Sequence, residues 1–298
     1  MNRRCPILSA SKLFVSHFFT LIFLIAATAT LSAQQLSKLP YVPTPQIVVD
    51  EMLKMAGVTA KDFVIDLGSG DGRMIISAAR TFKANGLGVD IDRKLVDLAA
   101  QQAKAAGVDD RVRFIEQDMF KADIGSATVV TLYVLPDFME KLRPKLLSEL
   151  RPGSRIVAHD YYMSGWYPDG QLTLTVPEKV AANGTDKAYL YLWIVPSVVD
   201  GHWRLDFAPG SGTPPLIIVS FNQQYQMLNA TATTAVGPLK TENAIIKGND
   251  IDFFITVGPN NYRFSGKVQG DKMEGTAVSS LTSNAISWRA TKLPPEKK

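Results

Sequence analysis

The stretch from Val64 to Arg73, with the sequence VIDLGSGDGR, constrains the fold of this chain more than any other. An apolar run closes at Asp66, glycines stand at positions 68, 70 and 72, and apolar residues then recur at helical spacing. This order predicts a strand, a tight turn and a helix. Because glycine lacks a Cβ, such a turn can lie against a bound molecule, and the helix after it presents unpaired N–H groups. We expect Asp66, at the carboxyl end of the strand, to face the same crevice.

Strands and helices alternate along residues 41–196. Besides the first strand, we predict strands at 84–92, 112–116, 127–133 and 155–159, and helices at 46–56, 74–82, 93–106 and 138–150. This alternation requires an α/β fold with a parallel sheet and right-handed crossovers. No clear helix precedes the last two predicted strands, 171–176 and 189–195, so the sheet should end in a near-hairpin and the domain at about Pro196.

An acid beyond the glycine turn indicates a nucleoside site. In nucleoside-binding α/β folds, an acid about 20 residues past the glycine loop accepts the two ribose hydroxyls. Asp90 follows Gly72 by 18 residues and fits this role. Asp92 could be the ribose ligand instead, or simply the N-cap of the following helix, and we take it as the cap.

The first predicted helix begins after Thr44-Pro45. Threonine before proline is typical of a helix N-cap with proline at the first helical position, so we expect Thr44 to cap the helix. The alternative is that this turn covers the ligand of the glycine loop.

Beyond Val198 the sequence pattern changes from alternating strands and helices to short strands only. Short apolar runs at 216–221, 251–257, 262–268 and 284–291 are separated by turn residues, with hairpin signals at 248–250 and 270–271. We predict that residues 198–298 form an all-β antiparallel barrel or sandwich, with Trp203 and Trp288 in its core. A protease-accessible linker is expected at Pro196-Ser197.

The N-terminal segment, residues 1–33, has the layout of a secretory signal peptide or a membrane anchor. Arg3 and Arg4 precede an apolar run from Leu13 to Ala27, and small residues follow. Either interpretation predicts that the protein is exported, as a periplasmic or secreted protein, or is anchored in a membrane through this segment.

Composition limits the chemistry. The single cysteine, Cys5, lies in the N-terminal segment, so we expect neither a disulfide nor a thiolate metal site, and no metal. The net charge of +4 comes without a dense basic block, so nucleic-acid binding is not indicated.

The glycine turn has a resemblance to a known class of enzymes. Arg73 stands where the dinucleotide fingerprint needs its last glycine. The spacing Asp-x-Gly-x-Gly-x-Gly resembles instead the first motif of the class I (seven-strand, Rossmann-like) S-adenosylmethionine-dependent methyltransferases. That resemblance implies S-adenosyl-L-methionine as cofactor, with the glycine loop against its methionine part. It favours Asp90 for the ribose and implies that Asp118 accepts the adenine amino group with Met119 against the ring. The residues that we expect at the cofactor are Thr44, Asp66, Gly68, Ser69, Gly70, Gly72, Asp90, Ile91, Asp118 and Met119.

Four motifs resemble a narrower group. They are VPTP at 42–45, DLGSGDGR at 66–73, VTLYVLP at 130–136 and RPGSRIVAHD at 151–160. They are similar to motifs of the lysine methyltransferases that act on the c-type subunits of mitochondrial ATP synthase and on the adenine nucleotide translocase, and of their bacterial relatives. The resemblance implies N-methylation of a protein lysine. A small amine as the acceptor, or an exported non-catalytic binding protein, remain the alternatives.

Three polar residues at predicted strand ends are candidates for catalysis. Tyr133, His159 and Asp160 would lie beside the crevice at the carboxyl ends of the strands. A base matters only if the acceptor arrives protonated, as a lysine does at its usual pKa near 10.4. The interpretation of each as an ordinary polar residue at a strand end is equally open.

Overall fold

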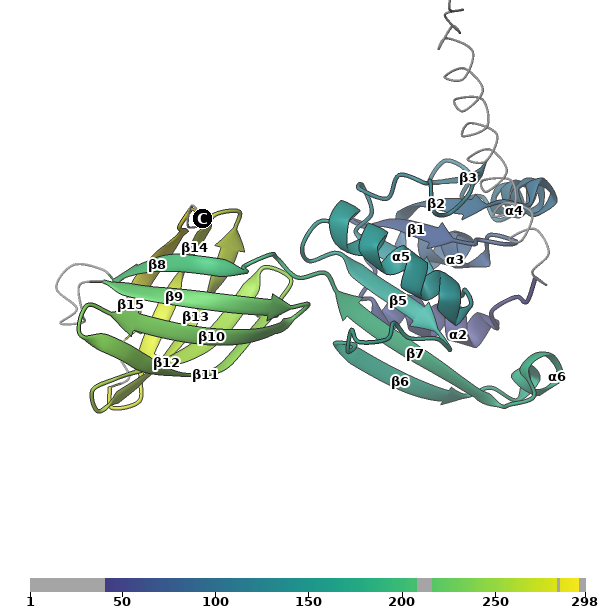
Figure 1. Cartoon of the computed structure of the whole chain (residues 1–298). Helices are drawn as coiled ribbons and strands as arrows, with labels where there is room; N and C mark the ends of the chain where they lie inside the picture. The colour runs from purple at the N-terminus through teal and green to yellow at the C-terminus, as the bar shows by residue number, and fades with distance from the viewer. Residues whose placement is uncertain (1–40, 208–215, 283–284, 295–298) are drawn as a thin grey trace, which may run out of the picture.

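The computed structural model describes residues 41–207, 216–282 and 285–294, and the predicted leader, residues 1–33, lies outside them. An α/β unit and a β-barrel lie side by side, joined by one connection between β7 and β8 (Figure 1). The predicted fold class, a seven-strand Rossmann-like sheet followed by an all-β unit, is confirmed.

The α/β unit is built on a seven-stranded sheet of order β3-β2-β1-β4-β5-β7-β6. Its strands are β1 (Phe63–Leu67), β2 (Asn85–Asp90), β3 (Val112–Glu116), β4 (Val129–Leu132), β5 (Arg155–His159), β6 (Gly170–Thr175) and β7 (Lys187–Ile194). Its helices are α2 (Gln46–Met55), α3 (Arg73–Phe82), α4 (Arg93–Ala105), α5 (Pro136–Glu149), the 3₁₀ turn η1 (Pro177–Lys179) and α6 (Val180–Asn183).

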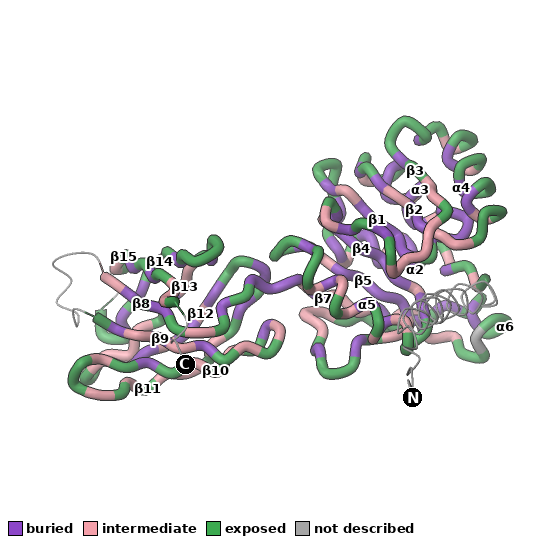
Figure 2. Tube along the Cα trace, turned by 45° about the horizontal axis from the view of Figure 1, so that its top comes forward, coloured by how far each residue is buried: buried purple, intermediate pink, exposed green. Residues whose placement is uncertain are grey.

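Apolar residues cover both faces of the sheet. Val64 of β1 joins a core cluster with α2 and α3, and its neighbour Ile65 joins the cluster on the other face, with α5. Figure 2 shows β1, β4 and β5 buried along most of their length. Burial on both faces explains why these strands are continuous apolar runs and not alternating ones.

The end of the sheet departs from regular alternation, as predicted. β7 runs antiparallel to both β5 and β6, so the sheet closes with a hairpin-like pair. No helix stands between β5 and β6; residues 160–169 form turns there. This irregular segment, which we call the β5–β6 loop, lies between the catalytic candidates and the barrel.

The predicted Thr44 cap is wrong. Pro45 occupies the N-cap position of α2, and no side chain caps that helix. A residue before proline is held in an extended conformation, because the proline ring crowds the α region. By contrast Asp92 caps α4, since its side chain accepts a hydrogen bond from the Lys94 N–H at 2.8 Å.

The second unit is a closed, eight-stranded antiparallel barrel of order β10-β11-β12-β13-β14-β15-β8-β9, which decides between barrel and sandwich. Its strands are β8 (Gly201–Phe207), β9 (Ile217–Gln224), β10 (Met227–Thr234), β11 (Gly237–Lys247), β12 (Asp250–Val257), β13 (Asn260–Gln269), β14 (Lys272–Ser279) and β15 (Ala285–Lys292). Trp203 and Trp288 are buried in its interior, as predicted.

The connection between the two units differs from the expected accessible linker. Val195, Pro196 and Ser197 are all buried. The Ser197 N–H donates to the Gly248 carbonyl at 2.8 Å, so the connection is fixed to the turn before β12. The sequence did not predict this burial, because proline and serine are typical of exposed loops. Ser197 is held against the barrel by its hydrogen bond to Gly248.

Candidate functional site

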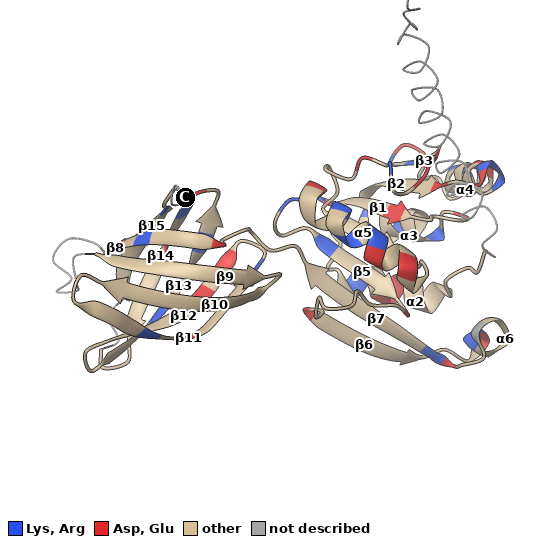
Figure 3. Ribbon diagram, viewed as in Figure 1, with Lys and Arg blue, Asp and Glu red and all other residues tan. Residues whose placement is uncertain are grey.

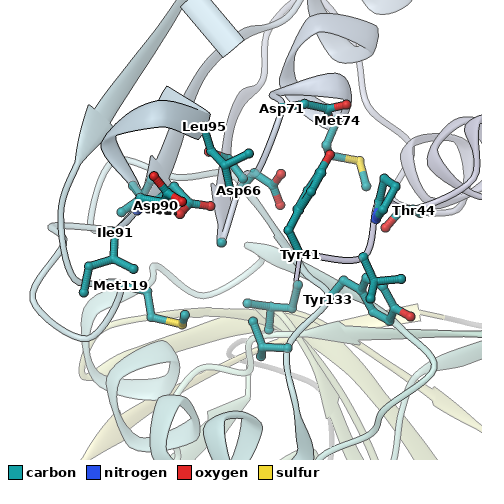
Figure 4. Close-up of a pocket in the computed structure, with 18 of the residues that line it drawn as sticks. Tyr41, Thr44, Asp66, Asp71, Met74, Asp90, Ile91, Leu95, Met119 and Tyr133 are labelled. Atoms are coloured by element: carbon teal, nitrogen blue, oxygen red, sulfur yellow. Dashed lines mark hydrogen bonds between the residues drawn. The ribbon is translucent and has the colours of Figure 1, made fainter. Parts of the chain in front are cut away.

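A cleft of about 290 Å³ opens at the carboxyl ends of the parallel strands, the usual ligand position in an open α/β sheet. Figure 4 shows side chains from β1, β2, the glycine loop and residues 41–44 converging on it. The cleft is lined by Tyr41, Val42, Pro43, Thr44, Asp66, Gly68, Ser69, Asp71, Arg73, Met74, Val89, Asp90, Ile91, Asp92, Leu95, Gln117, Met119, Leu132, Tyr133, Val134, Leu135, Phe138 and Tyr161.

Asp66 is a buried carboxyl group at the floor of this cleft. It lies in β1 opposite Thr131 of β4, whose hydroxyl donates to its Oδ1 at 2.6 Å. Burial raises the pKa of Asp66 to about 7, against the lowering effect of the Thr131 hydrogen bond, and the nearby Asp90 and Asp71 add to the rise. Such a carboxyl favours a cationic group beside it, because a cation offsets the cost of its buried negative charge.

Asp90 organises the glycine loop. Its Oδ2 accepts from the Gly70 N–H at 2.8 Å and its Oδ1 from the Asp92 N–H at 2.9 Å. A carboxylate oxygen can accept two hydrogen bonds, so each oxygen retains one acceptor position. Asp90 faces the cleft and can therefore receive a diol while it holds the loop.

The residues at 41–45, which we call the N-terminal strap, close over the glycine loop. The Arg73 guanidinium binds Asp71 through two nitrogens, at 3.0 and 2.6 Å, and donates to the Thr44 carbonyl at 2.8 Å. Tyr41 is hydrogen-bonded to Asp71, and burial together with that carboxylate raises the pKa of Tyr41 to about 12. The alternative interpretation of the Thr44 turn, that it covers the site, therefore agrees with this geometry: Thr44 is buried and lines the cleft.

Apolar side chains lie beside Asp90. Ile91, Leu95 and Met119 give that end of the cleft an apolar boundary (Figure 4). Asp118 is not among the lining residues. Its Oδ1 accepts from the Phe120 N–H at 2.9 Å, so it shapes the turn after β3.

Two glycines of the loop serve packing. Gly70 and Gly72 do not line the cleft, unlike Gly68 and Ser69. A Cβ on Gly72 would lie 2.6 Å from the Phe114 ring, and one on Gly70 would lie 2.4 Å from the Tyr41 ring. All three glycines have positive φ, so the turn needs them for its conformation as well.

The three catalytic candidates lie in different environments. Tyr133 lines the cleft, with its ring 4.1 Å from that of His159 and stacked 6.3 Å from that of Tyr161. His159 is buried behind Tyr133, and desolvation lowers its pKa to about 4, which leaves the ring neutral at pH 7. Asp160 is ion-paired with the buried Lys179, at 2.5 Å from Nζ. Neither His159 nor Asp160 lines the cleft.

Several functional positions carried little signal in the sequence. Tyr41 precedes the first periodic segment, and Lys179 follows a proline in a short turn, so neither belongs to an amphipathic pattern. Asp71 and Arg73 lie inside the glycine motif, and their spacing of two residues could have suggested the salt bridge that they form.

Charged side chains of both signs are distributed over the part of the chain that the structure describes. Figure 3 shows Lys and Arg spread over both units among acidic residues. Within the described ranges, no group of three or more His, Cys, Asp or Glu side chains is placed to hold a metal ion. Among the same residues, no helix is long and apolar enough to cross a membrane.

The strand order, the antiparallel β7 and a cleft beyond a glycine loop define a class I methyltransferase. The profile of the ANTKMT methyltransferase domain matches residues 66–170. A protein-lysine N-methyltransferase of Saccharolobus islandicus is 42% identical over 145 residues, which cover 46% of this chain and 90% of that relative. The chain therefore belongs to the family of S-adenosylmethionine-dependent methyltransferases that contains this domain.

Two further relatives show how far the similarity extends. A lysine N-methyltransferase of Xenopus laevis, named for its action on the C-type subunits of ATP synthase, is 34% identical, over 50% of this chain and 66% of that protein. The crystal structure of an RNA methyltransferase from Salinibacter ruber in complex with S-adenosyl-L-homocysteine is 47% identical and covers 53% of this chain and 96% of that one, with a TM-score of 0.48. The family profile ends at residue 170, before the barrel begins.

The cleft fits the cofactor of this family. Ser69 Oγ is buried beside it without a hydrogen-bond partner among the described residues, so a polar group of a ligand can satisfy it. Gly68, with φ of 86°, leaves its backbone open toward the cleft. The cleft combines acids with apolar residues, which suits the two kinds of surface of a nucleoside joined to a charged amino acid.

Proposed function

We propose that this protein methylates the side-chain amine of a lysine on another protein. The Saccharolobus relative carries the proposal, because the similarity covers nine-tenths of that protein's length and its name states this reaction. The lysine N-methyltransferases named for ATP synthase support the same acceptor chemistry.

Each part of the cleft has a role in binding the cofactor. Asp90 accepts the ribose hydroxyls at its two remaining positions, and Ile91 and Met119 flank the adenine. Gly68 and Ser69 lie against the methionine part, and the Asp66 carboxylate attracts its cationic groups. The N-terminal strap, held by Arg73, covers the bound molecule and reduces its contact with water.

The aromatic end of the cleft receives the acceptor. Bound S-adenosylmethionine supplies an electrophilic methyl group on a sulfonium. Tyr133 and Tyr161 present near-parallel rings, 16° apart, whose faces attract an ammonium group and its methylated products. The lysine would lose its proton to water, and its nitrogen would attack the methyl carbon in line, so that the N–C bond forms as the C–S bond breaks and S-adenosylhomocysteine leaves.

His159 and Asp160 support the aromatic end of the cleft from behind and do not act as bases. The His159 ring packs on Tyr133, and the Asp160 carboxylate is taken by Lys179. Positioning of the acceptor therefore supplies most of the catalysis, and Tyr133 is the one of the three candidates that can touch the substrate.

The test is transfer of labelled methyl groups to proteins of a membrane extract, with modified residues identified by mass spectrometry. We expect label on lysine Nζ with the wild-type protein and its loss in Asp90→Ala. Asp110→Asn, three-quarters exposed beyond α4, is the matched control and should keep full activity. Label found only on RNA, on small amines, or on oxygen or carbon would refute the proposed acceptor.

A further inference from the structure

The barrel contacts the methyltransferase unit where β5 begins, at the end of the β5–β6 loop that lies away from the cleft (Figure 1). The hairpin between β9 and β10 places Tyr225, with φ of 56°, against the β5–β6 loop. The Tyr225 ring stacks on that of Trp166 at 5.3 Å and 13°, and the Arg143 guanidinium of α5 lies 6.0 Å from the same ring. Gln226, almost fully buried, donates to the Tyr167 carbonyl at 2.5 Å.

The β5–β6 loop connects these contacts to the cleft. It leaves β5 at Asp160, carries Tyr161 along the cleft, and reaches Trp166 beside β7. Trp166 is fully buried, and its carbonyl accepts from Trp193 Nε1 at 2.9 Å. Only a few residues separate the hairpin contact at Trp166 from the ring of Tyr161.

The rest of the loop is held by contacts with other elements. Its first residue, Asp160, has a φ of 63°; its carboxylate pairs with Lys179, and its N–H donates to the Tyr189 carbonyl of β7 at 2.6 Å. Its middle is fixed from α5, where Glu140 accepts from the Ser164 N–H at 2.6 Å and Arg143 donates to the Ser164 carbonyl. A loop without a helix or strand takes its conformation from such external contacts.

The hairpin itself is rigidly attached to the barrel. The Gln223 side chain donates to the carbonyls of Tyr225 and Ser197, each at 2.8 Å, and accepts from the Val199 N–H at 2.7 Å. The Gln226 carbonyl accepts from the Ile246 N–H of β11. The barrel therefore presents Tyr225 and Gln226 from a fixed frame.

We propose that Tyr225 and Gln226 are positioning residues for the acceptor site: the barrel hairpin holds the β5–β6 loop, and so sets the place of Tyr161 in the cleft. This inference rests on the proposed function, because it assigns the acceptor side of that site to the loop. Cofactor contacts come from β1, β2 and the strap, so the hairpin governs acceptor binding and leaves cofactor binding unchanged.

The experiment compares the full-length variants Tyr225→Ala, Tyr225→Phe and Gln226→Ala with the wild type. Apparent KM and kcat are measured with labelled cofactor and a membrane-protein extract, and affinity for S-adenosylhomocysteine is measured by calorimetry. Loss of the ring stack should raise the apparent KM for the extract by roughly threefold to tenfold. Affinity for S-adenosylhomocysteine should stay at the wild-type value. Tyr225→Phe keeps the stack and should restore the wild-type KM.

Hydrogen exchange supplies a readout that does not depend on the acceptor. Amides of residues 160–169 should exchange faster in Tyr225→Ala, while those of β1 and β2 stay protected. If the wild type transfers no methyl group to protein, the proposed function fails while this readout still tests the positioning role.

A matched control separates positioning from barrel stability. Tyr262 is a half-buried tyrosine of β13 whose ring packs on Phe264 inside the barrel. Tyr262→Ala should lower the melting temperature without changing KM or loop exchange. An equal rise in KM with Tyr262→Ala, or wild-type KM and exchange in Tyr225→Ala, would overturn the inference.

Discussion

Replacing Asp66 by asparagine should stabilise the protein without ligand and make it bind its cofactor less well. The carboxyl lies buried against Thr131, and burial raises its pKa from 3.8 to about 7. Asparagine keeps the shape and its carbonyl still accepts the Thr131 hydrogen bond. The variant removes the cost of a buried negative charge, and its NH2 group can face the cleft.

The sign and size of the stability change follow from the linkage between proton binding and folding. A carboxyl with a raised pKa binds more protons in the folded state than in the unfolded state, so stability falls as pH rises from about 4 to about 7. A rise of about 3 pKa units corresponds to about 4 kcal/mol as an upper bound, reached above pH 7. Asp66→Asn should remove this loss and raise the melting temperature at pH 8, by at most about 8–16 °C.

The quantity to compare is the difference in stability between wild type and Asp66→Asn at each pH. The lowered pKa of His159 makes stability rise with pH between about 4 and 6.5, which opposes the effect of Asp66 in the wild type. Thermal unfolding of wild type and variant from pH 5 to 8.5 isolates the contribution of Asp66, because His159 is the same in both. Asp110→Asn serves as the exposed control.

Asp66→Asn should be more stable than wild type without ligand, but it should bind the cationic cofactor less well. A cationic ligand beside Asp66 favours the ionised form, so wild type should release a proton on binding S-adenosylmethionine near pH 6. Calorimetry in two buffers with different ionisation enthalpies detects that proton, and Asp66→Asn should bind more weakly without releasing it. Equal pH dependence of stability in wild type and variant would refute the reasoning.

Other perturbations test separate parts of the molecule. Asp90→Ala should weaken binding of S-adenosylmethionine by about 2–5 kcal/mol in calorimetry, because two hydrogen bonds to a charged acceptor are lost; unchanged affinity would contradict the ribose assignment. Lys179→Met should destabilise the fold by about 3–5 kcal/mol in denaturant unfolding, with Asp160→Asn in the same chain restoring much of it. The apolar run at 13–27 should direct the protein to or through a membrane; a tagged protein found in the cytosol with an intact N-terminus would show otherwise.

The sequence predicted those parts of the fold in which periodicity and turn chemistry agree. The strand at Val64, the glycine turn and the Asp92 cap depend on neighbours in the chain, and each was predictable. Strand β10, with the sequence MLNATATT, was not predicted because its alternation is between small and polar residues with little apolar contrast.

The candidate site was predictable where a motif carried it. Asp66 and Asp90 line the cleft, and both follow from their place at strand ends. The burial of Lys179 was not predictable, because its partner Asp160 lies 19 residues earlier and the two meet only through the β6–β7 pair. Contacts of this kind arise from the tertiary fold and leave no periodic trace.

Packing against the ring of Phe114 is a second reason, separate from ligand binding, for glycines in and near the motif. A Cβ on Gly72 or on Gly88 would lie 2.6 or 2.4 Å from that ring, so the bulk of one aromatic residue forbids side chains at both positions. In a descendant that no longer bound a ligand, selection on folding alone would still keep these two glycines. Gly68 has room for a Cβ, which would meet only Val134 at 3.6 Å, but its φ of 86° still favours glycine on folding grounds. Across relatives, loss of binding should therefore be sought at Asp90, and joint change of Phe114 with its two glycines should be taken as a record of repacking.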